Sequence, residues 1–419
     1  MKCTSIFWST LPFRSDKRSA GTRTPQRIGG GSLLLLALLA FSVQGCLGIG
    51  GSNGKQIATG SNGQQVSVNQ DVFTGKFYLT IDHNLYVLNG NNTTQELVNT
   101  GNVYDPAVSP DGKWVAFIEK YKEYSNLCVV STSGGAVRVL RNGNGHFYYQ
   151  GPYIHNNYYW YAQPAWSPDG STLLFLSDLE KEDWYQQTGE NAPMLDLQVF
   201  SIPFNDPTAT PKDVAYASFG DGGNRDPSYR PGHPDQIIYT HYAYDAATRT
   251  QQVIQLFMEN PNTISENPGV YYPGPPGGGY DPGIAITDPQ DDISEPAFSP
   301  DGNAIAYIKT GNTSMALYVM PTPPDSITQT PNNPATEKLA VQSFEKHSSL
   351  LMTQLYIEQP VWSPNGKQLA YIAYTGGTFD LWIANVSYNA KTEVYRIQGT
   401  PTQVTSGGID GEDRPVWTN

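Results

Sequence analysis

Six polar or charged residues stand directly before a proline at regular intervals along the chain. They are Asp105, Gln163, Asp226, Glu295, Gln359 and Arg414. Three carboxylates, two amides and one guanidinium are groups that bind a cation or the polar end of a chain. If the units that carry them lie side by side, these residues form one polar ring. The alternative is that they hydrogen-bond neighbouring units and serve the structure alone.

Aromatic residues gather in long connecting segments, which we expect at 142–161, 178–194 and 259–292. Aromatic rings on loops bring a large contact area at a low entropy cost, which suits them to stack on sugars or to grip a peptide. The ligand-binding residues predicted in this way are Tyr148, Tyr149, Tyr158, Trp160, Tyr161 and Trp184. The alternative is that the rings bury one another and order the loops.

Signals of a catalytic or metal centre are weak. The six histidines fall singly in different segments, without the paired spacing typical of a metal site. A Gly-x-Ser-x-Gly run at 50–54 lacks the strand and helix that a nucleophile elbow needs. The acidic segment 288–292 with Glu295 is a weak candidate for Ca²⁺, and a solvated loop is the alternative. We therefore predict no catalytic residue, no metal ligand and no cofactor beyond this weak calcium candidate.

The elements that must position these residues are repeated. Each of the six prolines is followed two residues later by a bulky side chain, as in Pro106/Val108, Pro164/Trp166, Pro227/Tyr229, Pro296/Phe298, Pro360/Trp362 and Pro415/Trp417. Four units run on into a Ser-Pro-Asp/Asn-Gly segment, which is a strong hairpin signal, and the third has Arg-Pro-Gly-His instead. Because the prolines recur at long and similar intervals, the pattern indicates a radial array of β units.

Each unit contains up to four short β segments and no convincing amphipathic helix. Apolar strands are expected after the turns at 114–119, 172–177, 236–241, 304–309 and 368–374, and a further strand follows in most units. Four strands per repeat make the blade of a β-propeller. The strand that carries the proline lacks one N–H group, so we expect it at the sheet edge that faces the central channel.

The Pro-x-Trp-Ser-Pro-Asp-Gly units, followed by Ala-Phe-Ile or Ala-Tyr-Ile, resemble the PD40 (WD40-like) repeats of TolB-type propellers. The resemblance covers about Phe77 to Asn419 and implies an all-β propeller. The α/β domain that precedes the propeller in TolB has no expected counterpart, so a role in outer-membrane maintenance is not carried over whole.

The first and last strand groups complete each other. Three strand-like runs within 76–98 have no proline strand before them, while Pro415 to Trp417 form such a strand with no partners of their own. Joining them makes one blade closed by the carboxyl-terminal strand. We therefore predict a six-bladed propeller of four-stranded blades over residues 76–419, with the polar ring at its channel mouth.

The amino end is typical of an export signal. Six basic residues and one acid precede the uncharged run Leu33 to Val43. Val43-Gln44-Gly45-Cys46 resembles the lipobox of bacterial lipoproteins, whose cysteine is diacylated. We predict a signal peptide at 1–45, lipidation of Cys46 and a flexible Gly/Ser/Asn tether at 46–75. The alternative is an uncleaved anchor within 28–51, and both place the rest of the chain outside the cytoplasm.

The charge of the exported part excludes one class of partner. Without residues 1–45 the chain carries 19 basic and 37 acidic residues, a formal charge of −18. Nucleic acid is an improbable partner, because phosphate binding needs a basic face. Cys46 would carry lipid and only Cys128 would remain, so no intramolecular disulfide is expected.

These observations predict a non-catalytic binding or scaffold propeller for protein or glycan partners. The protein would be lipid-anchored in a bacterial cell envelope, on its periplasmic or extracellular face. The alternative is a polysaccharide lyase or hydrolase that acts at the channel mouth. Histidine converging with acids at the mouth would favour the enzyme, and the predicted inner strands contain acids but no histidine.

Overall fold

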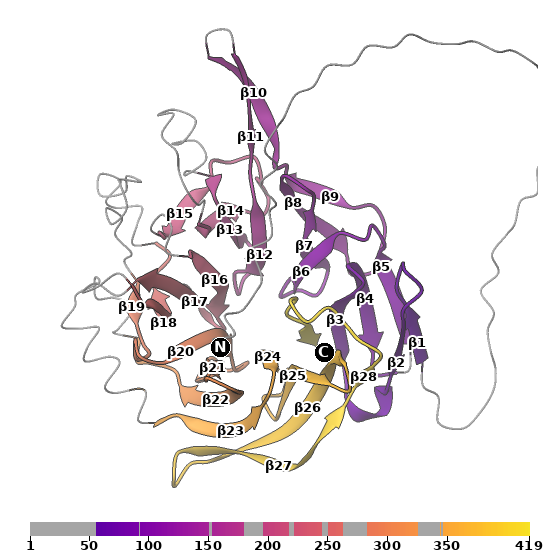
Figure 1. Cartoon of the computed structure of the whole chain (residues 1–419), viewed down its shortest axis with the longest axis vertical. Coiled ribbons are helices and arrows are strands. Elements are labelled where there is room, and N and C mark those ends of the chain that lie inside the picture. The colour runs from indigo at the N-terminus through magenta and orange to yellow at the C-terminus, as the bar shows by residue number, and fades with distance from the viewer. Residues whose placement is uncertain are drawn as a thin grey trace, which may run out of the picture. The chain divides into compact units, whose positions relative to one another are not determined.

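Antiparallel sheets stand around a central axis like the blades of a propeller (Figure 1). The computed structural model describes residues 56–91, 93–150, 153–179, 196–217, 222–244, 250–262, 283–325, 344 and 347–419. All of them belong to one compact unit, residues 54–419. No helix within these ranges is long and apolar enough to cross a membrane. The predicted signal peptide and Cys46 lie outside the described residues.

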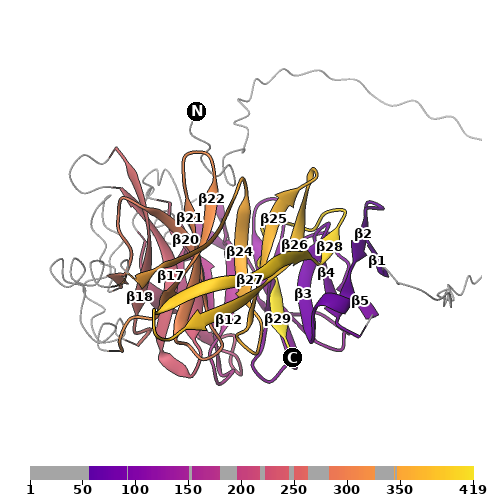
Figure 2. The ribbon, with the colours of Figure 1, turned by 90° about the horizontal axis from the view of Figure 1, so that it is seen from below.

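Six blades have four strands each, and the strands run from the channel outward in the order given. Blade I has β29 (Val416–Thr418), β3 (Lys76–Ile81), β4 (Asn84–Asn89) and β5 (Thr93–Val98). Blade II has β6 (Val103–Val108), β7 (Trp114–Lys120), β8 (Ser125–Ser131) and β9 (Arg138–Arg141). Blade III has β12 (Tyr161–Trp166), β13 (Thr172–Ser177), β14 (Gln198–Pro203) and β15 (Lys212–Ala215). Blade IV has β16 (Asn224–Arg230), β17 (His233–Tyr244), β18 (Gln252–Glu259) and β19 (Ile284–Ala285). Blade V has β20 (Asp292–Phe298), β21 (Ala304–Thr310), β22 (Met315–Pro321) and β23 (Ser349–Gln354). Blade VI has β24 (Ile357–Trp362), β25 (Gln368–Thr375), β26 (Thr378–Asn389) and β27 (Val394–Gln403). Figure 2 shows these sheets from the side.

The prediction of six blades is wrong, because a seventh sheet is present. It has three strands, β1 (Gln56–Thr59), β2 (Gln65–Val68) and β28 (Thr405–Ser406). Val66 and Val68 are buried in one apolar cluster with side chains of blades I and VI. Over the described residues the propeller therefore has seven blades, six of four strands and one of three. The repeats did not reveal the seventh because it contains no Pro-x-bulky strand.

The same sheet corrects the predicted tether. The composition predicts a flexible segment at 46–75, yet β1 and β2 pair antiparallel, and β2 pairs with β28. Gln65 and Ser67 alternate with the two buried valines, which is the period of a strand with one buried face. A short helical turn, η1 (Gln70–Val72), leads from this sheet to β3.

The carboxyl-terminal strand is the innermost strand of blade I, where the sequence predicts it. Trp417 pairs with Phe77 in the register of β29 and β3, and their ring centroids are 4.5 Å apart. The indole N–H of Trp417 donates to the carbonyl of Thr74 over 2.8 Å. Segments near the two ends of the described chain are thus joined in one sheet.

Bulky side chains of the inner strands pack onto small residues of the preceding blade. Trp166 of blade III donates its indole N–H to the carbonyl of Ala107 in blade II (3.0 Å), and Trp362 of blade VI repeats this with Ala297 of blade V (3.1 Å). Both indoles are buried. The alternation of large and small residues in the repeat therefore serves the contact between blades.

The Ser-Pro-Asp/Asn-Gly segments form the turns between the first and second strands of blades II, III, V and VI. In each, the serine hydroxyl donates to the Asp or Asn side chain and accepts from the first N–H of the next strand. The closing glycines, Gly112 and its counterparts, have φ between 68° and 72°. In blade IV, Arg230 takes the place of the serine and is buried, donating to the carbonyl of Gly302 in blade V (2.8 Å).

A two-stranded ribbon leaves the body of the propeller between blades II and III (Figure 1). It consists of β10 (Asn144–Gln150) and β11 (Tyr153–Tyr158). The predicted aromatic loop at 142–161 is therefore largely a β-hairpin.

Candidate binding site at the channel mouth

Five of the six predicted ring residues share one unusual backbone conformation. Their φ angles are positive: Asp105 52°, Gln163 44°, Asp226 55°, Glu295 57° and Gln359 52°. Each lies with its proline where the pairing of the first two strands shifts register, which marks a β-bulge. Such conformations cost about 1–3 kcal/mol each for non-glycine residues and persist only where the surrounding structure enforces them.

Hydrogen bonds between blades enforce this conformation. The N–H of one ring residue donates to the side chain of the ring residue in the preceding blade. The direct bonds are Gln163 N to Asp105 Oδ2 (3.0 Å), Asp226 N to Gln163 Oε1 (2.6 Å) and Gln359 N to Glu295 Oε2 (2.6 Å). Between blades IV and V the Thr240 hydroxyl mediates the link, accepting from Glu295 N and donating to Asp226.

Blade I completes the ring with Asp413, which the repeat pattern did not reveal. Asp413 Oδ1 accepts from the N–H of Asp105 (2.9 Å), and Oδ2 accepts from the hydroxyl of Thr80 (2.5 Å). Arg414 instead donates to Gln359 and to the carbonyl of Pro296, and its Nη2 lies 3.6 Å from Asp226 of blade IV. The sequence feature that could have identified Asp413 is its position beside Arg414. It lies one residue further from its proline than the ring residues of the other units do.

The ring residues therefore do hold the blades together, which is the structural alternative considered for them. Their predicted role in ligand binding stays a prediction.

Carboxylates crowd at this end of the channel. Burial raises the pKa of Asp105 to about 6, of Glu295 to about 7 and of Glu358 to about 9, and it raises that of Asp413 well above its usual value. Neighbouring acids add to the burial effect: Asp226 acts on Asp105 and Glu295, and Glu295 and Glu412 act on Glu358. The channel mouth is thus a region where negative charge is costly.

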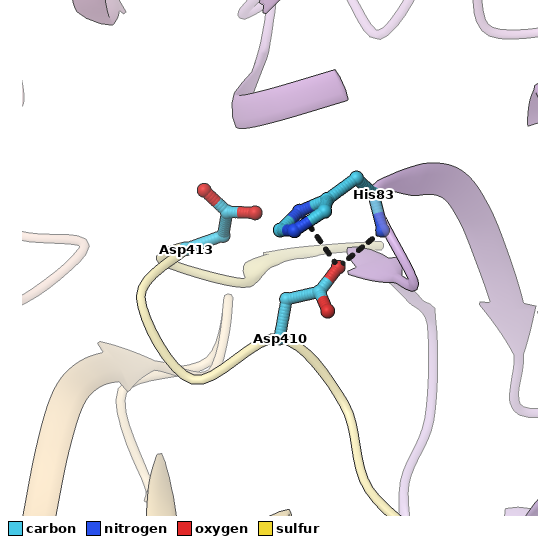
Figure 3. Close-up of side chains that lie close together, drawn as sticks. All are labelled: His83, Asp410 and Asp413. Carbon is cyan, nitrogen blue, oxygen red and sulfur yellow. Dashed lines mark hydrogen bonds and ion pairs between the residues drawn. The ribbon is translucent and has the colours of Figure 1, made fainter. Parts of the chain in front are cut away.

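A single histidine lies beside these acids, on a turn and not on one of the inner strands, in which the sequence predicted no histidine. His83 lies in the turn between β3 and β4, and Asp410 and Asp413 lie on the connection that leads to β29 (Figure 3). One ligand atom from each of the three lies within 4.8 Å of the others. His83 Nδ1 is 3.6 Å from Asp410 Oδ2 and 3.9 Å from Glu412 Oε1. No sequence spacing signals this group, because it joins a turn near the start of the propeller to a connection near its end.

Several aromatic rings lie on the turns and strand ends of the same face. The Tyr104 ring stacks on His83 with centroids 4.4 Å apart, and Lys120 lies over the same tyrosine at 4.8 Å. Tyr121 stacks on Tyr124 at 4.7 Å, and Tyr124 lies 6.2 Å from the predicted ligand-binding residue Tyr158.

The other aromatic residues predicted to bind a ligand differ in their burial. Tyr161 is 3% exposed and packs edge-on against Phe175, so it is a core residue and its predicted ligand contact is wrong. Trp160 is half-buried, and its backbone N–H donates to Asp178. Tyr148 and Tyr149 lie on β10, where only their backbone is described, and Trp184 lies outside the described residues.

The weak calcium candidate at 288–292 has partners of its own. Asp291 forms an ion pair with Lys309 (2.5 Å), and Asp288 Oδ1 accepts from the N–H of Gln290 (2.8 Å). These contacts favour the alternative of a solvated loop.

Fold and site together define a β-propeller whose inner strands carry a ring of hydrogen-bonded polar residues. Acidic side chains crowd at the channel mouth beside this ring. Compared by sequence, the chain matches no protein-family model and no curated protein. Compared by structure, it is similar to TolB from Acinetobacter baumannii, with a TM-score of 0.50 and 15% identity. The match covers 82% of this chain and 66% of the TolB chain, which is just under two thirds of that protein.

Looser similarities extend to other propellers. An oligogalacturonate lyase from Vibrio parahaemolyticus gives a TM-score of 0.42 at 13% identity and covers 84% of each chain. The propeller domain of the Trilobed protease from Pyrococcus furiosus gives 0.38 at 10% identity, covering 83% of this chain and 82% of that one. The radial four-stranded sheets and the similarity to TolB make the fold that of a TolB-like propeller, as the repeats predicted.

Proposed function

We propose that this protein is a non-catalytic binding module of the bacterial cell envelope, and that its channel mouth takes a basic segment of a partner protein. The observation that carries the proposal is the crowding of carboxylates around the ring, where burial and mutual repulsion raise the pKa of Glu295 and Glu358. A cation placed among such groups stabilises their charged forms. The mouth therefore favours the binding of a Lys or Arg side chain.

Few cationic groups among the described residues neutralise this cluster. Arg414 lies inside the ring and is engaged with Gln359, Pro296 and Asp226. Lys120 lies over Tyr104 and lowers the pKa of Asp105 to only a small extent, since burial dominates there. An acidic region with so little compensation favours basic partners, because a cation among these carboxylates stabilises their charged forms.

The aromatic rings suit the same partner. A tyrosine face attracts Lys and Arg side chains by cation–π interaction within about 6 Å of the ring centroid. Tyr104, Tyr121 and Tyr356 lie on segments of the mouth face, and the latter two are 38% and 40% exposed. An anionic glycan would meet repulsion at the same place, which favours a protein over an acidic polysaccharide.

The test uses labelled oligopeptides of lysine, of glutamate and of serine, with binding to the full chain followed by fluorescence anisotropy at several salt concentrations. We expect salt-dependent binding of oligolysine alone, weakened at least about tenfold, or about 1.4 kcal/mol, by Glu358→Gln combined with Glu412→Gln. Asp169→Asn, in a turn at the other end of the inner strand, is the matched control. Equal binding by the double variant would remove the mouth as the site.

The envelope location and the lipid anchor rest on residues 1–46. Labelling with a radioactive fatty acid, in cells that express the chain or its Cys46→Ala variant, tests both. Label that depends on Cys46 supports the anchor, and label that persists without it contradicts the anchor.

A polysaccharide lyase or hydrolase at the channel mouth is the second candidate. The observation that favours it is the convergence of His83 with Asp410 and Asp413, which supply the acid, base or metal-binding groups that such chemistry needs. Incubation with oligogalacturonides and with peptidoglycan fragments, with Mn²⁺ or with EDTA, separates the two candidates. A product that forms only with metal would replace the binding module by an enzyme.

A further inference from the structure

We propose that His83, Asp410 and Asp413 form a binding site for a divalent first-row transition-metal ion of the Zn²⁺ type. The inference goes beyond the proposed function and does not depend on it, since a metal site at the mouth is compatible with a binding module or an enzyme. It rests on the donor set, on an imidazole nitrogen without a hydrogen bond, and on supports that hold both carboxylates in place.

The donor set has the right composition and spacing. One ligand atom from each residue lies within 4.8 Å of the other two. Zn²⁺ bonds of about 2.0–2.2 Å to nitrogen and oxygen bring such atoms somewhat closer, which small side-chain rotations accomplish. A site with one imidazole and two carboxylates selects a borderline ion over Ca²⁺, which takes six to eight oxygen ligands.

The imidazole has no hydrogen bond at its buried nitrogen. Nδ1 of His83 is inaccessible to solvent and has no hydrogen-bond partner among the described residues, although the side chain as a whole is 32% exposed. Buried polar atoms are nearly always hydrogen-bonded, so an orphaned imidazole nitrogen needs an explanation. The nearest carboxylate oxygens, Asp410 Oδ2 and Glu412 Oε1, lie 3.6 and 3.9 Å from this nitrogen, which is beyond hydrogen-bond distance.

Both carboxylates are held in place by groups outside the donor set. Asp410 accepts from the backbone N–H groups of Asp82 (3.2 Å) and His83 (2.7 Å). Asp413 accepts from the Thr80 hydroxyl and from the N–H of Asp105. Each carboxylate oxygen has two lone pairs, so these bonds leave acceptor capacity for a metal and orient it in the manner of a second shell.

Among the described residues, no lysine or arginine forms an ion pair with either carboxylate. The nearest partner of positive character to Asp410 and Asp413 is His83. The Tyr104 ring stacks on His83 and limits rotation of the imidazole. The three donors are therefore oriented, and no ion pair with a described lysine or arginine engages the two carboxylates.

The experiment measures Zn²⁺ binding to the full chain, freed of metal with EDTA and carrying no histidine tag, by isothermal titration calorimetry. We expect one Zn²⁺ per chain, bound more tightly than Ca²⁺ or Mg²⁺, and a rise in melting temperature on addition of Zn²⁺. His83→Ala should weaken binding more than about 100-fold and abolish that rise.

His347→Ala is the matched control, because His347 Nδ1 also lies 3.6 Å from a carboxylate, that of Glu393, but has no third donor among the described residues. It should leave binding unchanged. Asp410→Asn provides a second variant if His83→Ala alters the fold, which circular dichroism would show. The proposal is overturned if the parent chain binds no Zn²⁺, if Ca²⁺ binds more tightly, or if both variants bind as the parent does.

Discussion

The turn ends and the mouth ends of the inner strands carry carboxylates with opposite properties. At the turn end, Asp111 accepts from the Ser109 hydroxyl and from Lys113, and these donors lower its pKa to about 2; Asp169 follows the same pattern with Ser167 and Ser171. At the mouth end, burial raises the pKa of Asp105 and Glu295. An acidic side chain therefore stabilises the turn at one end of the inner strands, whereas burial destabilises its charged form at the other end.

The difference lies in where the donors come from. A Ser-Pro-Asp-Gly turn supplies its own donors from residues next to the aspartate, and solvent reaches the charge. In the ring each carboxylate accepts at least one hydrogen bond from another blade and lies close to further acids. Local sequence is enough for the first arrangement, whereas the second exists only when the blades close.

The largest expected effect comes from opening the ring. Deletion of 414–419 removes β29, Arg414 and the Trp417 contacts with Phe77 and Thr74. We expect loss of cooperative thermal unfolding by circular dichroism, because blade I loses its inner strand and the ring its closing link. A deletion variant that melts cooperatively at the parent temperature would show that closure is unimportant.

Replacement of one carboxylate at each end compares the two regions directly. Asp413→Ala leaves the Thr80 hydroxyl and the Asp105 N–H unsatisfied in a buried position, and should lower the free energy of unfolding by about 2–4 kcal/mol. Asp169→Ala removes exposed turn bonds and should cost only about 1 kcal/mol. Denaturant unfolding measures both, and equal losses would contradict the distinction.

The stability of the protein should fall as pH rises, because the pKa values of the mouth carboxylates are raised in the folded state. Glu295 has a pKa raised from 4.5 to about 7, so between these values the folded protein holds a proton that the unfolded chain has lost. The free energy of unfolding then falls as pH rises through this window. We expect a higher melting temperature at about pH 5 than at about pH 7.5 from this group, and a smaller difference in Glu295→Gln. Asp169→Asn should leave the difference unchanged, because the pKa of Asp169 is lowered.

The smallest expected effect concerns the turn end. Gly366 has φ 68°, and a Cβ atom there would meet no atom closer than 3.8 Å, so only the backbone conformation opposes a side chain. Gly366→Ala should cost about 1–2 kcal/mol. Lys367→Ala, at the exposed neighbouring position, should be close to neutral. A neutral Gly366→Ala would mean that the turn needs no left-handed residue.

The repeats predicted most of the fold, and the errors have definite causes. Proline at the bulge and Ser-Pro-Asp-Gly at the turn act over a few residues, so six four-stranded blades and the closing strand follow from the pattern. The seventh blade has neither signal. Its strands β1 and β2 are short, and their partner β28 comes from near the other end of the chain. A stretch rich in Gly, Ser and Asn therefore had the composition of a tether although part of it is paired.

The positions of the ring residues were predicted better than their contacts. The ring positions followed from the residues before the prolines, and five of the six share the bulge conformation. Asp413, not Arg414, provides the acceptor in blade I. Tyr161 is predicted on a binding loop and is buried, because it begins the inner strand β12.

By itself the sequence determined the repeat unit, its turns and the identity of its inner strand, because proline, glycine and short-range side-chain bonds act within a few residues of each other. Only the tertiary structure decided the number of blades, the links between ring residues and the meeting of His83 with Asp410 and Asp413. These depend on closing a ring, which brings the first and last turns of the propeller together. The repeat pattern predicted the closing strand, but no spacing along the chain predicted which side chains that closure brings into contact.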